Sequence, residues 1–210
     1  MGILIKKYVD TDVFLGLWDI TEDHETLIAD LKLNKEDLKI LNKFKNENRK
    51  LEWLSVRKLL AELTNPEIDI IYNKDRKPFL SDKSYNISIS HSKNFTSIIL
   101  SKHKKVGIDL EFMSHRISKI SHKFINKNEK ITSNPDLLKY HLYIHWCSKE
   151  ALYKICDKQE INFKDNITLE PFEPTVCGTV KGYVNTNHIN ESFDLNFFRL
   201  NNYIIAWCCK

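Results

Sequence analysis

The length, composition and charge of the chain are those of a globular protein. Its 210 residues are enough for one large or two small domains, and 42% hydrophobic with 29% charged residues is typical of a soluble fold. A formal net charge of +4 is too small to argue for nucleic acid, although it suits an anionic partner. The five cysteines show no metal-binding spacing, and no apolar run suits a signal peptide or a membrane span. We expect a cytoplasmic protein with reduced thiols, without a zinc site and without a nucleic-acid or membrane partner.

The first hundred residues predict strands and helices in mixed order, with polar turns between them. Apolar alternation indicates strands, and apolar residues at helical spacing from Glu36 to Leu63 indicate helical faces, interrupted by a polar patch at 45–50. The expected elements are strands at 3–8, 13–18 and 68–72, helix starts at Thr21 and Asn34, and a helix end at Pro66.

Several polar residues in this half stand where ligands can bind. Arg49 lies in or near a helix, and Lys77 precedes proline in a turn over 73–78. A following hairpin is expected to carry Ser90, His91 and Ser92 in its connection, where ligand groups tend to gather. By itself each of these residues is better explained as an ordinary surface or structural residue.

Two acids lie on one face of the next predicted strand. Val106, Ile108 and Leu110 alternate with Gly107, Asp109 and Glu111, which is the period of a half-buried strand. Side-by-side acids repel one another unless a cation or a proton lies between them. A solvated edge-strand face is the competing interpretation.

A helix is predicted from Leu137 to about Cys156. It places Trp146, Glu150 and Lys154 on one face, because these residues are four apart. An ordinary surface ion pair is one interpretation of Glu150 and Lys154. Together with the two strand acids, however, Glu150 completes a three-carboxylate set of the kind that holds Mg²⁺ beside phosphates.

Two further stretches of the chain are predicted to form elements without clear chemistry. A helix leading into a loop is expected at 124–129, where Glu129 is either a further acid near the metal or a helical surface residue. Three strands are expected at 176–184, 193–198 and 203–208, with turns at Gly182 and Asn201-Asn202.

In order and approximate spacing, five motifs resemble the 4′-phosphopantetheinyl transferases of the surfactin-synthetase-activating (Sfp) type. They are Lys77-Pro78, Ile89-Ser90-His91-Ser92, Gly107-Ile108-Asp109-Leu110-Glu111, Phe124 to Glu129, and Trp146 to Lys154. The resemblance spans about residues 49 to 154 by motif. Two positions depart from the family pattern, because Arg76 stands where glycine is usual and Met113 where threonine is frequent.

The resemblance implies an α+β fold of two similar α/β halves related by a pseudo-twofold, with the ligand cleft between them. We expect an N-terminal half at 1–104 and a C-terminal half at 105–210. It further implies that the nucleotide end of coenzyme A is contacted from the first half, by Arg49, Lys77, Ser90 and His91.

The activity so implied is that of a holo-acyl-carrier-protein synthase type transferase. Phosphopantetheine would pass from coenzyme A to a serine of an apo acyl, polyketide or peptidyl carrier protein, releasing adenosine 3′,5′-bisphosphate. Asp109, Glu111 and Glu150 would hold Mg²⁺, Glu150 would be the base, directly or through water, and Lys154 would stabilise the pyrophosphate charge. We expect a monomer.

Two alternatives stay open at this point. An acid pair with a distant Glu and Lys also suits a Mg²⁺-dependent nuclease or phosphodiesterase, although the basic residues form no stripe. A non-catalytic binder of coenzyme A or of a carrier protein is the other, although a binder would not need Asp109, Glu111, Glu150 and Lys154 together.

Overall fold

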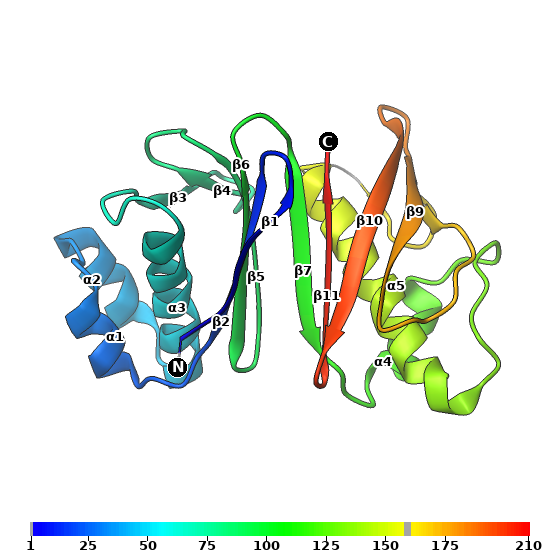
Figure 1. The fold of residues 1–210 in the computed structure, drawn as a ribbon, viewed down its shortest axis with the longest axis horizontal. Coiled ribbons are helices and arrows are strands. Elements are labelled where there is room, and N and C mark those ends of the chain that lie inside the picture. Colours follow the sequence, from blue (N-terminus) through cyan, green and yellow to red (C-terminus); the bar gives the residue numbers. More distant parts are fainter. Residues whose placement is uncertain (1, 158–160) are drawn as a thin grey trace. The chain divides into compact units, whose positions relative to one another are not determined.

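The computed structural model describes residues 2–157 and 161–210. The chain divides into two compact units, residues 1–103 and 104–210, each with its own sheet and helices (Figure 1).

The first unit is built on an antiparallel sheet of four strands in the order β1-β2-β6-β5, joined by a small β3-β4 ribbon. Three helices precede the ribbon in the chain. The elements are β1 (Ile3–Asp10), β2 (Val13–Asp19), α1 (His24–Asp30), α2 (Lys35–Lys43), α3 (Glu47–Leu63), β3 (Ile70–Tyr72), β4 (Pro78–Leu80), β5 (Asn86–Ser92) and β6 (Phe95–Ser101).

Helix starts in this unit are fixed by polar caps. Asp23 caps α1, and Asn34 forms a capping box with Asp37 at the start of α2, as the sequence predicted near these positions. The predicted interruption near 45–50 is shorter than expected, because Asn46 caps α3 and the helix already includes residues 47–50.

Helix α3 packs on one face of the sheet, against β2 and β6 (Figure 1). Gly16 on β2 makes room for it, because a Cβ there would lie 2.6 Å from Leu63 and 3.0 Å from Leu59. The core between the helix and the sheet includes Leu59 and Leu60 of α3 and Ile98 and Leu100 of β6.

The predicted hairpin is present, but its turn lies later in the chain than expected. Ser90, His91 and Ser92 belong to strand β5 and pair with Ser97, Thr96 and Phe95 of β6. The turn is made instead by Lys93 and Asn94, where Lys93 takes the left-handed conformation with φ 51°. The sequence predicts the turn too early because the polar residues Ser90, His91 and Ser92 are typical of loops. Serine and histidine are, however, tolerated at the end of a strand.

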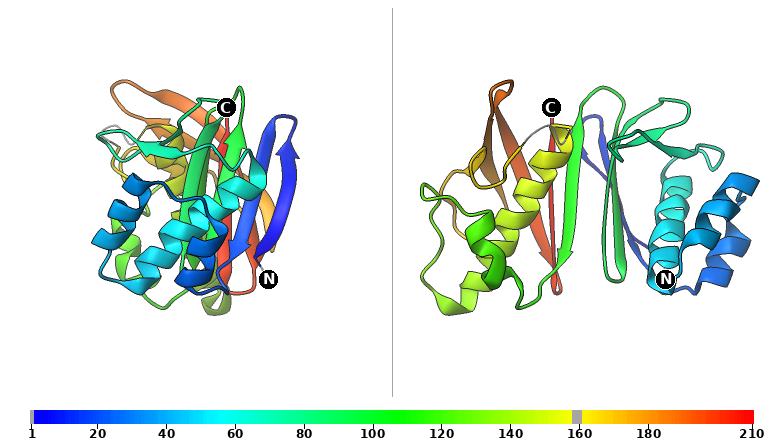
Figure 2. Two further views of the ribbon diagram at one scale, coloured as in Figure 1. Left: turned by 90° about the vertical axis from the view of Figure 1, so that its left-hand side faces the viewer. Right: turned by 180° about the vertical axis from the view of Figure 1, so that it is seen from behind.

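The second unit is built on an antiparallel sheet of five strands in the order β7-β11-β10-β9-β8. The long helix α5 lies across one face of it, over β7 and β11 (Figure 2). The elements are β7 (Val106–Phe112), α4 (Ile117–Ile120), a 3₁₀ turn at Ser121–Lys123, α5 (Pro135–Ile155), β8 (Ile167–Leu169), β9 (Cys177–Asn185), β10 (Asn190–Leu200) and β11 (Tyr203–Cys209).

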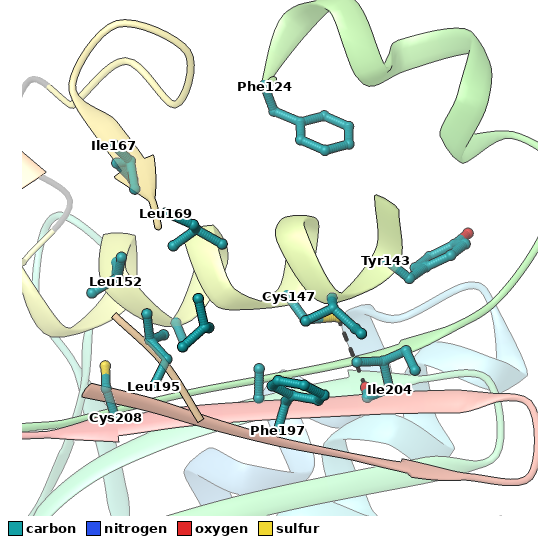
Figure 3. Close-up of a cluster of buried hydrophobic side chains, with 14 of the residues drawn as sticks. Phe124, Tyr143, Cys147, Leu152, Ile167, Leu169, Leu195, Phe197, Ile204 and Cys208 are labelled. Carbon is teal, nitrogen blue, oxygen red and sulfur yellow. Dashed lines mark hydrogen bonds between the residues drawn. The ribbon is translucent and has the colours of Figure 1, made fainter. Parts of the chain in front are cut away.

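The core of this unit lies between α5 and the sheet. Figure 3 shows Cys147 and Leu152 of the helix above Leu195, Phe197, Ile204 and Cys208 of the strands, with Phe124 closing the far side of the helix. The sulfur of Cys147 approaches the Ile204 carbonyl oxygen at 3.8 Å. The helix therefore buries two sides, one on the sheet and one under the segments that flank it.

Two predictions about this unit are wrong. Residues 124–129 are turn and coil rather than helix, because the preceding α4 and 3₁₀ turn end at Lys123. Gly182 lies inside β9, paired with Phe193, rather than in a turn. Glycine is needed there for packing, since a Cβ would lie 2.7 Å from Leu195 and 2.8 Å from Leu152. The predicted turn at Asn201-Asn202 is present, with Asn201 at φ 52°.

Among the described residues, no helix is long and apolar enough to cross a membrane.

Candidate functional site

The two strand acids face helix α5. In the register of β7 with β11, Gly107 lies opposite Cys208, Asp109 opposite Ala206 and Glu111 opposite Ile204. The three β11 residues belong to the core beneath α5, so the acids point to the helix-covered face. A solvated edge is thereby excluded for Asp109, which is 4% exposed.

Gly107 lets the helix come close to this strand. A Cβ at this position would lie 2.1 Å from the backbone carbonyl oxygen of Ala151, a distance that no folded protein tolerates. The close approach brings the next turn of the helix, which carries Lys154, within reach of β7.

Lys154 joins the helix to the strand. Its Nζ lies 2.8 Å from Asp109 Oδ1 and donates to the Ile108 carbonyl oxygen at 2.9 Å. Solvent still reaches this pair, since the Lys154 side chain is 18% exposed and that of Asp109 6%. An ammonium and a carboxylate at the rim of a packed surface can both contact a charged ligand.

Glu111 belongs to the same charged site. The pKa of the Cys147 thiol is raised well above its usual value by burial, and next by the charges of Asp109 and Glu111. Both carboxylates therefore lie near the middle of α5. Glu111 and Glu150 are each partly exposed, unlike the sealed Cys147.

The described side chains do not form a complete metal centre. Within residues 2–157 and 161–210, no group of three or more His, Cys, Asp or Glu side chains is arranged to hold a metal ion. The three-carboxylate site of Asp109, Glu111 and Glu150 thus stays a prediction. Mg²⁺ is often held by only one or two carboxylates together with substrate phosphates, and the oxygen donors of Asp109 and Glu111 fit that chemistry.

A second ion pair lies on another side of α5, between Lys149 and Glu129. Both side chains are fully buried, with Lys149 Nζ 2.8 Å from Glu129 Oε2. The same ammonium donates to three carbonyl oxygens, at 2.5 Å to Phe124, 2.8 Å to Ile167 and 3.0 Å to Phe163. Lys149 thereby ties α5 to the segments before it and after it.

Glu129 is a buried acid and not a helical surface residue. Its two carboxylate oxygens accept backbone N–H groups of Asn126 and Leu169, each at 2.9 Å, in addition to the Lys149 contact. Burial alone raises the pKa of Glu129, but His145 and Lys149 outweigh it and the pKa is lowered. The carboxylate is thus held charged inside the protein, and its role is structural.

Two buried histidines extend this charged cluster. His145 Nδ1 lies 3.5 Å from Glu129 Oε1, and His141 lies one turn earlier with its ring centre 5.0 Å from that of His145. Phe172 packs against both rings, and the Thr132 N–H donates to His141 Nδ1. Burial, and next the neighbouring His145, lower the pKa of His141 from 6.5 to about 4.

Sequence reasoning missed Lys149, although a signal for it exists. His141, His145, Lys149 and Leu152 recur at spacings of four, four and three, so they share one stripe of the helix. A lysine in such a stripe requires a buried partner. The partner is twenty residues away in coil, and no local pattern marks it.

In the first unit, the structure brings together two of the four predicted coenzyme A contacts. Arg49 Nη1 lies 3.5 Å from His91 Nε2, and both side chains approach Glu52 Oε2, at 2.6 Å from Arg49 and 3.5 Å from His91. Glu52, on the next turn of α3, was not identified from the sequence. A carboxylate between an arginine and a histidine orients both groups.

Ser90 and Lys77 are placed differently. Ser90 precedes His91 in β5, so their side chains project from opposite faces of the strand. Lys77 lies in the turn between β3 and β4, where its N–H donates to Asn73 Oδ1 at 2.8 Å. The preceding Arg76 has φ 59°, a left-handed conformation that favours glycine.

Met113 also has a structural explanation. Its side chain is 6% exposed and belongs to the core of the second unit, and its N–H donates to the Asn202 carbonyl oxygen at 2.8 Å. An apolar residue suits this position because it packs under α5.

Residues 105–208 match the family model described as the 4′-phosphopantetheinyl transferase superfamily. The comparison with curated proteins found no match. The matched residues run from the start of β7 almost to the end of β11 and include both ion pairs of α5. The second unit, over nearly its whole length, is thus similar to the 4′-phosphopantetheinyl transferase superfamily, and this similarity suggests a transferase acting on phosphopantetheine.

Proposed function

We propose that the protein is a phosphopantetheinyl transferase of the surfactin-synthetase-activating type, which moves phosphopantetheine from coenzyme A to a serine of an apo carrier protein. The observation that carries the proposal is the half-open pair of Asp109 and Lys154, beside Glu111, inside a segment that matches the superfamily. Charge of both signs at one rim suits a pyrophosphate together with a cation.

In the proposed reaction, the serine hydroxyl attacks the β-phosphate of coenzyme A. A new oxygen–phosphorus bond forms, the bond to the bridging pyrophosphate oxygen breaks, and adenosine 3′,5′-bisphosphate leaves. Glu150 takes the hydroxyl proton, and the Lys154 ammonium donates to the pyrophosphate oxygens, where negative charge develops.

Asp109 and Glu111, with Glu150, would hold Mg²⁺ in this proposal. When bound, the ion supplies positive charge against the phosphate oxygens. The Lys154 contact with Asp109 adds a second cation at the same rim, so one pyrophosphate would be neutralised from two directions.

The nucleotide end of coenzyme A is assigned to the first unit. Arg49 and His91 lie 3.5 Å apart and would contact phosphate oxygens, with Glu52 holding both in place. Lys77 is proposed to contact a phosphate from the β3-β4 turn. Ser90 is proposed to contribute a hydroxyl from the other face of β5.

The decisive experiment supplies apo carrier proteins of the fatty-acid, polyketide and peptide classes with coenzyme A and Mg²⁺. Mass spectrometry should show one phosphopantetheine on a single serine of at least one carrier, with an equal amount of adenosine 3′,5′-bisphosphate released. Chelation of the metal should stop both.

Two variants test the site in the same assay. Asp109→Asn should abolish transfer, whereas Asp194→Asn should not, because Asp194 is a 71% exposed acid on the same sheet. If all carriers stay unmodified while added nucleic acid is degraded, the acids belong to a phosphodiesterase. Coenzyme A retained without turnover would indicate a binder.

A further inference from the structure

A cavity of about 410 Å³ opens on the first unit, apart from all the residues assigned above. It lies on the sheet face that α3 covers, beside Leu63, the last residue of that helix. Beyond the end of the helix the sheet continues with Phe14 of β2 and Leu100 of β6, which are directly paired. The cavity is therefore the part of the sheet face that α3 is too short to cover.

Aromatic rings form the walls of this cavity. Tyr8 lies opposite Phe14 in the β1-β2 register, and their ring centres are 4.8 Å apart. Tyr85, just before β5, lines another side. Tyr8 is 72% exposed, so much of its ring is available to a ligand. Exposed aromatic surfaces of this kind favour a planar ligand, because aromatic rings pack favourably against one another.

Two ammonium groups line the same cavity. Lys6 Nζ donates to the Glu62 carbonyl oxygen at 2.6 Å, which uses one of its three donors. Lys102 Nζ lies 5.7 Å from the centre of the Tyr85 ring and has no ion-pair partner among the residues that the structure describes. Both cations can therefore donate to an anion in the cavity.

Among the described residues that line the cavity, the one acid is already engaged. Asp12 Oδ2 accepts the Ser101 hydroxyl at 2.7 Å and the His103 N–H at 2.8 Å. These contacts hold the carboxylate on the β6 end of the sheet. Two lysines against one engaged aspartate leave the described lining with a net positive charge.

We propose that this cavity binds a small aromatic anion, a planar ring that carries a carboxylate or a sulfonate. The ring packs against the aromatic side chains of Tyr8, Phe14 and Tyr85, and the anion accepts from Lys6 and Lys102. The volume lies within the range of small-molecule sites, about 300–1,000 Å³. The site does not depend on the transferase activity proposed above.

The test uses the full chain and 2-naphthoate as the probe, with binding followed by isothermal titration calorimetry. Saturable binding is expected. The neutral analogue 2-naphthalenemethanol and the non-aromatic anion cyclohexanecarboxylate should each bind at least about tenfold more weakly, since each lacks one of the two contacts.

Three variants locate the binding. Lys102→Gln and Tyr8→Ser should each weaken naphthoate binding at least about fivefold, and both alter exposed side chains. Lys32→Gln is the matched control, an exposed lysine of the same unit outside the cavity, and should bind like the parent chain.

Competition with coenzyme A separates this site from the proposed transferase site. Naphthoate binding should persist when coenzyme A is saturating. Displacement by coenzyme A, absence of saturable binding, or equal affinity in Lys102→Gln, Tyr8→Ser and the parent chain would each overturn the proposal.

Discussion

Helix α5 contributes two lysines to two ion pairs of the same length, and the pairs differ in almost everything else. Lys149 and Glu129 meet at 2.8 Å with no solvent access, while Lys154 and Asp109 meet at 2.8 Å at a surface that solvent reaches. Distance alone therefore does not indicate what an ion pair does. A sealed pair can only hold segments together, whereas an accessible pair can exchange its partner for a ligand.

The number of fixed contacts deepens this contrast. Lys149 uses every donor on protein oxygens, and Glu129 is held by two backbone N–H groups as well. A ligand could enter this network only by unfolding the surrounding coil. Function on α5 is thus expected at residues 150 and 154, and stability at residues 145 and 149.

The largest expected effect comes from breaking the sealed pair. Lys149→Met leaves the Glu129 carboxylate buried without a counter-charge, so the free energy of unfolding should fall by about 3–5 kcal/mol in urea denaturation. Adding Glu129→Gln should restore part of the loss, because the orphaned charge is then removed. A loss under about 1 kcal/mol in Lys149→Met would show that water reaches the pair.

The buried histidine His141, on the same side of α5 as the sealed pair, should also make stability depend on pH. His141 titrates at about 4 in the folded protein against 6.5 when unfolded, so the unfolded chain binds more protons between these values. The contribution of neutral His141 to stability is therefore fully present above pH 6.5 and is lost as the pH falls toward about 4. The two pKa values correspond to a loss on the order of 3 kcal/mol.

The variant His141→Leu isolates this contribution. It should be less stable than the parent at neutral pH, because the Thr132 N–H loses its acceptor. Its stability should nevertheless fall less steeply between pH 6.5 and 4 in urea melts at successive pH values. Equal slopes for variant and parent would remove His141 as the source.

Changing the accessible pair should affect the reaction rate strongly and the stability only weakly. In Lys154→Met the rate of phosphopantetheine transfer should fall about 100-fold, equal to about 2.7 kcal/mol in activation free energy, since a donor to the pyrophosphate is lost. The free energy of unfolding should fall by only about 1–2 kcal/mol. A folded Lys154→Met protein with parental kcat/KM would place Lys154 outside the reaction.

The smallest effect concerns salt. Mobile ions screen charges that solvent reaches and hardly affect sealed ones. The stability difference between parent and Lys154→Met should therefore shrink by about 0.5 kcal/mol between low and roughly 1 M NaCl. The difference for Lys149→Met should stay constant over the same range. A parallel response of both variants would show that solvent reaches the two ion pairs equally.

Sequence patterns predicted the two elements on which the site rests. The alternation at 106–111 is strand β7, and the helical spacing around Trp146 and Lys154 is α5, which begins two residues earlier than predicted, after the Asn134 cap. Both predictions succeeded because apolar periodicity and caps are local properties.

Contacts between distant segments could not be predicted in this way. Glu129 reaches Lys149 from coil, and Glu52 joins Arg49 to a histidine 42 residues away in the chain. Such contacts follow from how elements pack. The prediction that Ser90 and His91 lie in a turn failed for a related reason. The register of β5 with β6 decides which residues form the turn and which remain paired.

Gly107 has a consequence for how this protein can vary. It sets the separation of α5 and β7 by lacking a side chain, so it acts as the spacer between two rigid bodies. Any larger residue would push the whole helix outward, and a rigid helix transmits that shift along its length. One methyl group would then change the geometry of the sealed pair and of the accessible pair together. A substitution at this position could therefore not alter one ion pair without altering the other.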